Sequence, residues 1–302
     1  MKDSQNGTIP RNLWSQSVIH LPPNLIRIYK DALLSRNLFV DACGPSPEES
    51  DIIGGDSDSA TIKYFTHRFA TSAVRLEYLV LNPIKQFDKI ASDLLTSLTD
   101  GKITILDIPC GSGAGILSLL GTIAELRSQR CIVQLPVSIC ITGGDYSNNA
   151  LEIYNSLLPE LNVWVQQYGI NISWNTHDWD ATRPDSTAQL IDNWFNSASG
   201  EEEYLVLINA FSGAGNRDFD SIQRSIQHIT ERLYNKSCTI VWVEPSWGES
   251  QSLFKKLKKL FEKISWFPSL DKEPIGSKFK WMHPFKRETY NGSILVKEYI
   301  RR

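Results

Sequence analysis

The chain has 302 residues, of which 41% are hydrophobic and 22% are charged, and its formal net charge is −3. This is ordinary globular composition with enough length for a sizeable core, and so small a net charge gives no reason to expect bulk affinity for nucleic acid. No apolar run approaches the roughly 20 residues of a membrane helix, and no signal-peptide region opens the sequence. The five cysteines lack C-x-x-C and zinc-site spacing. These features predict a cytoplasmic protein with reduced thiols, no membrane contact and no metal site.

The first hundred residues carry mainly helical patterns. After an irregular start at 1–20, apolar spacing predicts helices at about 24–36, 60–81 and 84–98. An acidic stretch rich in glycine, proline and serine at 43–59 predicts a surface loop between the first two helices. We therefore expect residues 1–100 to form an N-terminal helical extension.

From residue 101 onward, strands alternate with helices. The strands are predicted at 103–108, 137–143, 171–175, 204–209 and 238–244, and the helices that follow them at 115–127, 148–168, 186–197, 219–234 and 249–264. This alternation predicts a parallel sheet with right-handed crossovers. Two closing strands, 278–285 and 293–300, are expected to be antiparallel because only a short turn at Asn291-Gly292 joins them. The predicted fold class is α/β: a seven-stranded, mostly parallel sheet with an antiparallel last strand and helices on both faces.

The segment ILDIPCGSGAG, residues 105–115, joins the first of these strands to its helix. Its apolar half is typical of a buried strand, which ends at Asp107. Gly111, Gly113 and Gly115 allow a sharp turn and leave bare backbone beside which a ligand can lie. A strand, a glycine turn and a helix start together offer backbone N–H groups to a ligand.

Polar residues follow the other strands at the edge of the sheet where open α/β sheets bind ligands. Asp145 and Tyr146 follow the second strand, Asp178 and Trp179 the third, Asn209 the fourth, and Glu244 the fifth. The Asp145 carboxylate can accept hydrogen bonds from both hydroxyls of a ribose. An aspartate beside a tryptophan can bind and stack on a purine, and Asp107 can pair with a ligand ammonium group. The set fits a ligand that joins a nucleoside to an amino acid.

The stretches LDIPCGSG, GGDYSNNAL and HDWDAT, with the antiparallel last strand, resemble the motifs and topology of class I (Rossmann-like) S-adenosylmethionine-dependent methyltransferases. The resemblance covers residues 101–302 and implies that this part is the methyltransferase domain. It implies S-adenosyl-L-methionine as the cofactor, bound by Asp107, Gly111, Ser112, Gly113, Asp145, Tyr146, Asp178, Trp179 and Asn209. Pro109 departs from the commonest motif, which has a glycine there. The 38-residue step from Asp107 to Asp145 is long and predicts an insertion at 127–136.

The resemblance implies methyl transfer from a sulfonium group to a nucleophile, which depends mostly on in-line placement. Glu244 and Asn209 are the catalytic candidates. The turn that starts at Asn209 lacks the prolines of DNA amino-methylating enzymes, and the one Pro-Cys pair, Pro109-Cys110, lies in the glycine loop. A small molecule, an RNA or a protein side chain remains as the methyl acceptor. Because no long insertion follows the fourth or fifth strand, residues 1–100 are expected to cover the cofactor cleft and exclude water.

The C-terminal part of the chain is basic. Residues 255–302 hold 13 Lys/Arg against 5 Asp/Glu, although the whole chain is slightly acidic. This keeps an RNA partner open, with Trp281, His283 and Phe285 as possible stacking surfaces between the charges. A balance of these lysines against the acidic remainder of the fold is the simpler interpretation.

Two other classes of function are compatible with the sequence. A catalytically silent methyltransferase-like scaffold would share the motifs and bind a partner without turnover. An NAD(P)-dependent oxidoreductase also uses a glycine turn and an acidic strand tip, but its acidic residue falls about 20 residues further along.

Overall fold

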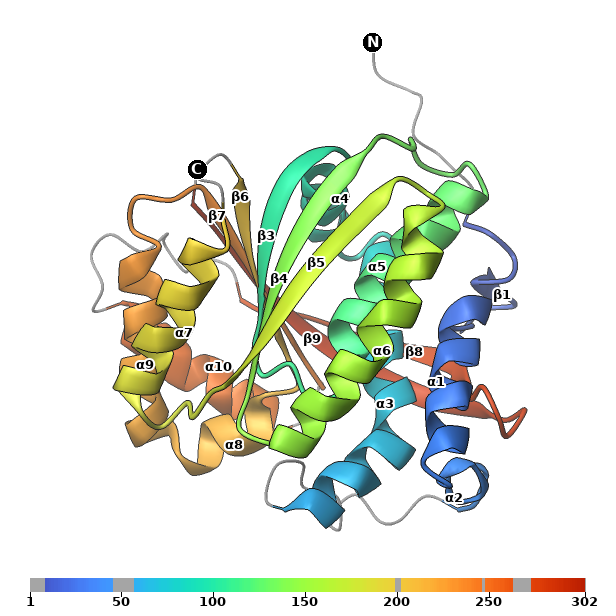
Figure 1. Cartoon of the computed structure of the whole chain (residues 1–302), viewed down its shortest axis with the longest axis horizontal. Coiled ribbons are helices and arrows are strands. Elements are labelled where there is room, and N and C mark those ends of the chain that lie inside the picture. The colour runs from blue at the N-terminus through green and yellow to red at the C-terminus, as the bar shows by residue number, and fades with distance from the viewer. Residues whose placement is uncertain (1–8, 46–56, 199–201, 246–247, 263–272, 302) are drawn as a thin grey trace.

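The computed structural model describes residues 9–45, 57–198, 202–245, 248–262 and 273–301 (Figure 1). Their strands form one sheet in the order β1-β2-β8-β9-β7-β6-β3-β4-β5. The strands are β1 Trp14–Ser15, β2 Val18–Ile19, β3 Gly101–Asp107, β4 Val137–Asp145, β5 Ile170–Asp178, β6 Glu203–Asn209, β7 Cys238–Glu244, β8 Ile275–Met282 and β9 Thr289–Arg301.

The parallel part of the sheet has the topology that the alternation of strands and helices predicts. β3 pairs in parallel with β4 and β6, β4 with β5, and β6 with β7. β9 lies between β7 and β8 and is antiparallel to both. The α/β fold class is therefore confirmed. The described strands number nine rather than the expected seven, because the two-residue strands β1 and β2 extend the sheet beyond β8.

The turn between the last two strands lies outside the predicted position. Met282 pairs with Thr289, so the connection is formed by residues 283–288. Asn291 and Gly292 lie inside β9 instead, and Gly292 pairs with Phe279. A Cβ on Gly292 would come within 2.4 Å of the Phe279 ring. The glycine is therefore a packing requirement of the strand pair, and the predicted Asn-Gly turn is wrong.

Helices cover both faces of the sheet (Figure 1). They are α1 Pro23–Ser35, α2 Phe39–Cys43, α3 Asp58–Leu81, α4 Asp88–Ser97, α5 Ala114–Ser128, α6 Asn148–Gln166, α7 Pro184–Asn196, α8 Ser212–Arg217, α9 Phe219–Arg232 and α10 Gly248–Phe261. One buried cluster joins α1, α3, α5 and α6 to the sheet, and a second joins α7, α9 and α10 to the other face. The sequence does not predict α2 and α8, because helices of 5 and 6 residues are too short for a periodic pattern. The end of the last predicted helix, at 263–264, lies outside the described residues.

The N-terminal helices pack against the helices of the strand–helix region. The Ser118 hydroxyl of α5 donates to the backbone oxygen of Ala73 in α3 at 2.6 Å. At the start of α3, the hydroxyls of Thr61 and Ser147 lie 2.9 Å apart, which places the first turn of α3 beside the loop before α6. The boundary at residue 100 and the role of residues 1–100 as a cover stay predictions. Within the described ranges, no helix is both long and apolar enough to span a membrane.

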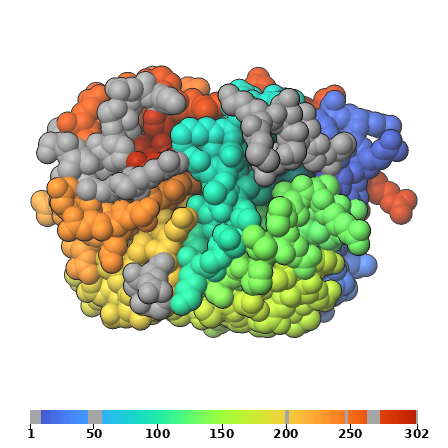
Figure 2. Space-filling view, turned by 90° about the horizontal axis from the view of Figure 1, so that it is seen from above, coloured from blue at the N-terminus to red at the C-terminus, as the bar shows by residue number. Residues whose placement is uncertain are grey.

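Arg127 binds three loops to one another at the amino edge of the parallel strands. Figure 2 shows the molecule from this edge, with the teal segment around α4 in the middle of the view. Its guanidinium donates to the backbone oxygens of Leu98, Thr99, Leu135 and Tyr168 at 2.8–3.0 Å. The side chain is 1% exposed, and burial lowers the pKa of the guanidinium. A buried cation needs such a set of acceptors, so Arg127 organises the edge opposite the candidate site.

Candidate functional site

Asp107 ends β3, the middle one of the five parallel strands, and lies at the carboxyl edge of the sheet, the lower edge in Figure 1, where α6 and α8 begin. Its carboxyl group is 1% exposed and accepts a hydrogen bond of 3.2 Å from the hydroxyl of Tyr154 in α6. Burial raises the pKa of Asp107 well above its usual range, whereas the Tyr154 hydroxyl acts in the opposite direction. A cationic ligand group beside Asp107 would stabilise its ionised form.

The glycine loop after β3 is open on one side and packed on the other. Gly111 and Gly113 have φ values of 51° and 89°, in the left-handed region that favours glycine. A Cβ on Gly113 would come within 2.7 Å of the Leu117 side chain and 3.1 Å of Tyr154. A Cβ on Gly111 would meet no atom within 4 Å. The loop therefore packs on α5 and α6 through Gly113 and leaves space for a ligand beside Gly111, with Ser112 buried between them.

Asp145 joins the tip of β4 to the glycine loop. One carboxylate oxygen accepts the backbone N–H of Gly111 at 2.8 Å, and the other accepts that of Ser147 at 2.9 Å. The backbone N–H of Cys110 also donates to the oxygen of Gly144 at 2.9 Å. Burial raises the pKa of Asp145, and the N–H groups lower it. Two motifs that lie far apart in the sequence are thus held together by the carboxylate predicted to bind a ribose.

The residues at the ends of β4 and β5 differ in exposure. Asp178 pairs with Asp145 in the strand register and is exposed, and Tyr146 is 65% exposed. Trp179 is 4% exposed and donates its indole N–H to Thr187 of α7 at 2.9 Å. Its backbone N–H donates to the backbone oxygen of Asp145 at 2.9 Å. Asp178 and Tyr146 can thus reach a ligand from the surface, while the indole lies among core residues of the α7 face. Their roles with a cofactor stay predictions.

Asn209 and Glu244, the two catalytic candidates, end the neighbouring strands β6 and β7. The Oδ1 atom of Asn209 is buried and has no hydrogen-bond partner among the described residues. Glu244 is fully buried and accepts from three donors, namely the backbone N–H groups of Phe211 and Ser212 and the indole N–H of Trp242, at 2.7–3.1 Å. Burial raises the pKa of Glu244, and these donors lower it. Glu244 fixes the turn into α8, whereas Asn209 has acceptor capacity left for a ligand.

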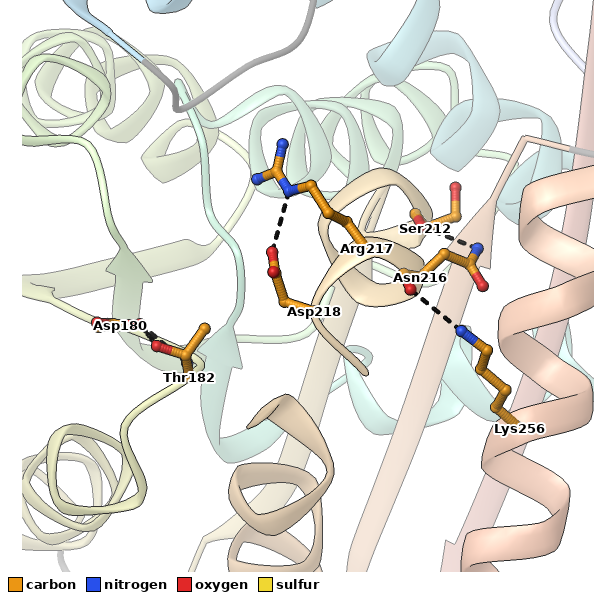
Figure 3. A network of polar contacts seen from close by, with 7 residues as sticks. All are labelled: Asp180, Thr182, Ser212, Asn216, Arg217, Asp218 and Lys256. Atoms are coloured by element: carbon orange, nitrogen blue, oxygen red, sulfur yellow. Dashed lines mark hydrogen bonds and ion pairs between the residues drawn. The ribbon is translucent and has the colours of Figure 1, made fainter. Parts of the chain in front are cut away.

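Figure 3 shows how α8 is held beside the site. The Asn216 side chain donates to the backbone oxygen of Ser212 at 3.0 Å, and the Lys256 ammonium group of α10 donates to the backbone oxygen of Asn216 at 3.1 Å. Arg217 extends from the other side of α8 and pairs with Asp218 at 3.0 Å (Figure 3). The contacts with α10 fix the short helix that follows Asn209. Ser246 and Trp247, which follow β7, lie outside the described residues.

The structure therefore joins the glycine loop to Asp145 by a hydrogen bond, with Asp107 at the tip of the neighbouring strand and with Asp178 and Asn209 on the flanking strands. Sequence reasoning missed Tyr154, which contacts both Asp107 and the loop. A tyrosine on the apolar face of a helix is typical of a core residue, so no signal distinguished it. Among the described residues, no group of three or more His, Cys, Asp or Glu side chains is arranged to hold a metal ion.

No protein-family model and no curated protein matches the sequence. Among solved structures, the chain is similar to precorrin-6y C5,15-methyltransferase from Geobacter metallireducens, with 11% identity over 70% of this chain and 87% of that one and a TM-score of 0.35. It is similar to a SAM-dependent O-methyltransferase from Thermotoga maritima, with 12% identity over 74% and 72% and a TM-score of 0.34. An rRNA methylase from Streptococcus thermophilus gives 10% identity over 70% and 95% and a TM-score of 0.30.

Proposed function

We propose that the chain binds S-adenosyl-L-methionine at the carboxyl edge of the sheet and transfers its methyl group to an acceptor. The observation that supports this most strongly is the contact between the Asp145 carboxylate, at the tip of β4, and Gly111 of the glycine loop, which follows the adjacent strand β3. It couples an acidic strand tip to a glycine turn that follows a buried aspartate. The antiparallel β9 between β7 and β8 adds the topology expected of a class I methyltransferase.

The chemistry of the donors and acceptors at this edge fits the cofactor. Each Asp145 oxygen holds one backbone N–H and keeps lone pairs for a ribose hydroxyl. The open side of Gly111 leaves room beside the backbone. Asp107 offers a carboxyl group, and the buried Oδ1 of Asn209 offers an unused acceptor, for an ammonium group. Such a group would relieve the cost of burying both.

Catalysis in this site would depend on the in-line placement of the methyl donor and the acceptor. When bound, the cofactor supplies an activated methyl group on a good leaving group. Because three donors already occupy the Glu244 carboxylate, we assign it to holding the Phe211–Ser212 turn rather than to proton transfer. The short helix α8, which follows Asn209, would form one side of the site. The hydrogen bond from Lys256 to the backbone oxygen of Asn216 holds this helix in place (Figure 3).

The acceptor is proposed to be an RNA, a small molecule or a protein side chain. The residues after Asn209 form the start of α8 without the prolines of DNA amino-methylating enzymes. The basic C-terminal part of the chain favours RNA among the three. We also propose that the protein is cytoplasmic, because five cysteines without paired spacing suit a reducing compartment.

Transfer of a tritiated methyl group from labelled cofactor to cell extract, fractionated into RNA, protein and small molecules, tests the proposal. We expect label in one fraction with the natural chain and a loss of label with Asp145→Ala. Asp220→Asn, at an exposed aspartate of α9, is the matched control and should keep the activity. Cofactor binding without label in any fraction would favour the silent scaffold, and binding of NAD instead would favour the oxidoreductase.

A further inference from the structure

Two of the three aromatic rings expected to stack on RNA lie in the core instead. Trp281 is 3% exposed, on the buried face of β8. Phe285 packs between Tyr29 and Phe39, with ring centroids 5.4 and 5.2 Å apart. The expectation that these two rings are stacking surfaces is therefore wrong. The N-terminal part of the chain, by contrast, makes a direct contact with the loop that follows the tip of β4 at the candidate site.

Thr61, in the first turn of α3, makes this contact. Its hydroxyl lies 2.9 Å from the hydroxyl of Ser147, within hydrogen-bond distance. Both residues are buried, with exposures of 5% and 9%. In Figure 1 the lower end of α3 lies beside the lower end of α6, at the carboxyl edge of the sheet. The contact therefore joins the N-terminal part of the chain to the loop of residues 145–147 at the tip of β4.

The direction of the Thr61 hydroxyl differs from that of a second threonine in the same helix. A threonine in a helix can donate to the backbone oxygen four residues earlier. Thr66 does so, with Ile62 at 2.8 Å, and it is as buried as Thr61 at 5% exposure. The Thr61 hydroxyl instead contacts a residue outside α3. α3 thus contains one threonine whose hydroxyl bonds within the helix and one whose hydroxyl contacts the site loop.

Ser147 connects Thr61 to the Asp145 carboxylate. The backbone N–H of Ser147 donates to one Asp145 oxygen at 2.9 Å. Its hydroxyl oxygen accepts the backbone N–H of Ala150 at 3.2 Å and so caps the start of α6. A hydroxyl group has two lone pairs and one proton, so the contact with Thr61 is compatible with this cap in either direction. Thr61 therefore fixes a residue that holds Asp145 through its backbone and begins α6 through its side chain.

The helix that Ser147 caps also reaches the second carboxyl group of the site. Tyr154 lies about two turns further along α6 and donates its hydroxyl to Asp107 at 3.2 Å. The other oxygen of Asp145 accepts the backbone N–H of Gly111 at 2.8 Å. The start of α6 thus governs the position of both carboxyl groups and of the glycine loop.

We propose that Thr61 is a positioning residue of the cofactor site, whose hydroxyl holds the loop of residues 145–147 in the conformation that lets Asp145 accept the ribose hydroxyls. The inference rests on the proposed function, because it assigns Thr61 a role in binding S-adenosyl-L-methionine. Thr61 acts through Ser147 and need not touch the cofactor. Without the Thr61 hydroxyl, the buried Ser147 hydroxyl loses a partner and the loop is held less firmly. A residue that only packs α3 against α6 would change the stability of the fold but not the affinity of the folded chain.

Isothermal titration calorimetry of the full chain with S-adenosylhomocysteine tests the role of the hydroxyl. Thr61→Val keeps the shape of the side chain but removes the hydroxyl, and it should weaken binding by about three- to tenfold. Thr61→Ser keeps the hydroxyl and should bind within about twofold of the natural chain. Thr66→Val is the matched control, because it removes an equally buried hydroxyl from the same helix, and its affinity should also stay within about twofold. Thr61→Ala is measured beside Thr61→Val, so that the comparison does not depend on the folding of one variant.

Two further measurements test whether Thr61 acts through Ser147. In a Ser147→Ala background, Thr61→Val should have little additional effect on the affinity, because the partner of the hydroxyl is already absent. Hydrogen exchange of the backbone N–H of Ser147, measured without cofactor, should be faster in Thr61→Val and unchanged in Thr66→Val.

The assignment is overturned if the folded Thr61→Val and Thr61→Ala variants bind S-adenosylhomocysteine as tightly as the natural chain. It is also overturned if Thr61→Ser or Thr66→Val loses as much affinity as Thr61→Val, if the effects of Thr61→Val and Ser147→Ala add in full, or if the exchange at Ser147 does not change. Each of these outcomes leaves the proposed function standing, because the natural chain still binds. A natural chain that does not bind S-adenosylhomocysteine would refute the proposed function itself, and the role of Thr61 with it.

Discussion

Replacement of Asp145 by asparagine tests whether the Asp145 carboxylate binds the cofactor or only stabilises the fold. In the folded chain, its two oxygens accept the N–H groups of Gly111 and Ser147 at 2.8 and 2.9 Å. The amide of asparagine has one oxygen, so it can keep one of these bonds while its NH2 group opposes the other donor. One backbone contact and one ribose acceptor are therefore lost together.

The size of the effect follows from the hydrogen bonds involved. A charge-assisted hydrogen bond contributes about 1.5–3 kcal/mol, and about 1.4 kcal/mol corresponds to a factor of ten in affinity. Asp145→Asn should therefore weaken S-adenosylhomocysteine binding by roughly 10- to 100-fold. Asp220→Asn is again the control for expression and folding, because its exposed side chain lies on α9.

Isothermal titration calorimetry at pH 7.5 and at lower pH gives the measurement. Burial raises the pKa of Asp145, so its ionised form is lost earlier than that of an ordinary aspartate as the pH falls. The affinity of the natural chain should fall with decreasing pH, and the asparagine variant should lack this part of the dependence. A folded Asp145→Asn variant that binds within twofold of the natural chain would refute the ribose assignment.

Two further substitutions test the site, and a third tests Glu77, a fully buried carboxyl of α3 away from the site. Glu244→Gln should lower the free energy of unfolding by about 1–3 kcal/mol, measured with urea, because its NH2 group would face a backbone donor; unchanged stability with lost transfer would instead make Glu244 catalytic. Tyr154→Phe removes the hydroxyl that counters the raised pKa of Asp107 and should weaken cofactor binding about fivefold, or about 1 kcal/mol, in calorimetry without unfolding the chain; an unaltered affinity would contradict its positioning role. Glu77→Gln should stabilise the fold at pH 8 more than at pH 5, because burial raises the pKa of Glu77 and its contribution to stability is lost as pH rises through that value; equal effects at both pH values would speak against a buried, high-pKa carboxyl.

Sequence patterns predicted well those strands and helices whose apolar residues recur with a regular local spacing. The strands that end at Asp107, Asn209 and Glu244 begin and end within two residues of their expected bounds. Parallel pairing then brings strand tips to one edge, so the proximity of Asp107 and Asp145 follows from topology alone. The direct bond from Gly111 to Asp145 does not follow from topology, because it depends on the path of the glycine loop.

Features that depend on packing between distant residues escaped prediction. Gly292 is typical of a turn in sequence, yet its place is decided by the ring of Phe279 on the neighbouring strand. Trp281 follows Lys278 and Lys280 in the sequence, which is typical of an exposed residue in a basic segment. Strand alternation instead points its side chain into the core. Arg127 has no motif around it, and its four backbone partners come from loops far apart in the sequence. Such roles are set by tertiary contacts, which no local pattern encodes.

Calorimetric titration of the full chain with S-adenosyl-L-methionine and, separately, with NAD tests whether the carboxyl edge of the sheet is a methyl-donor site. We predict saturable binding of one S-adenosyl-L-methionine per chain, weakened by Asp145→Asn, and no binding of NAD. Binding of NAD, or no binding of S-adenosyl-L-methionine to the folded chain, would contradict the assignment of this edge.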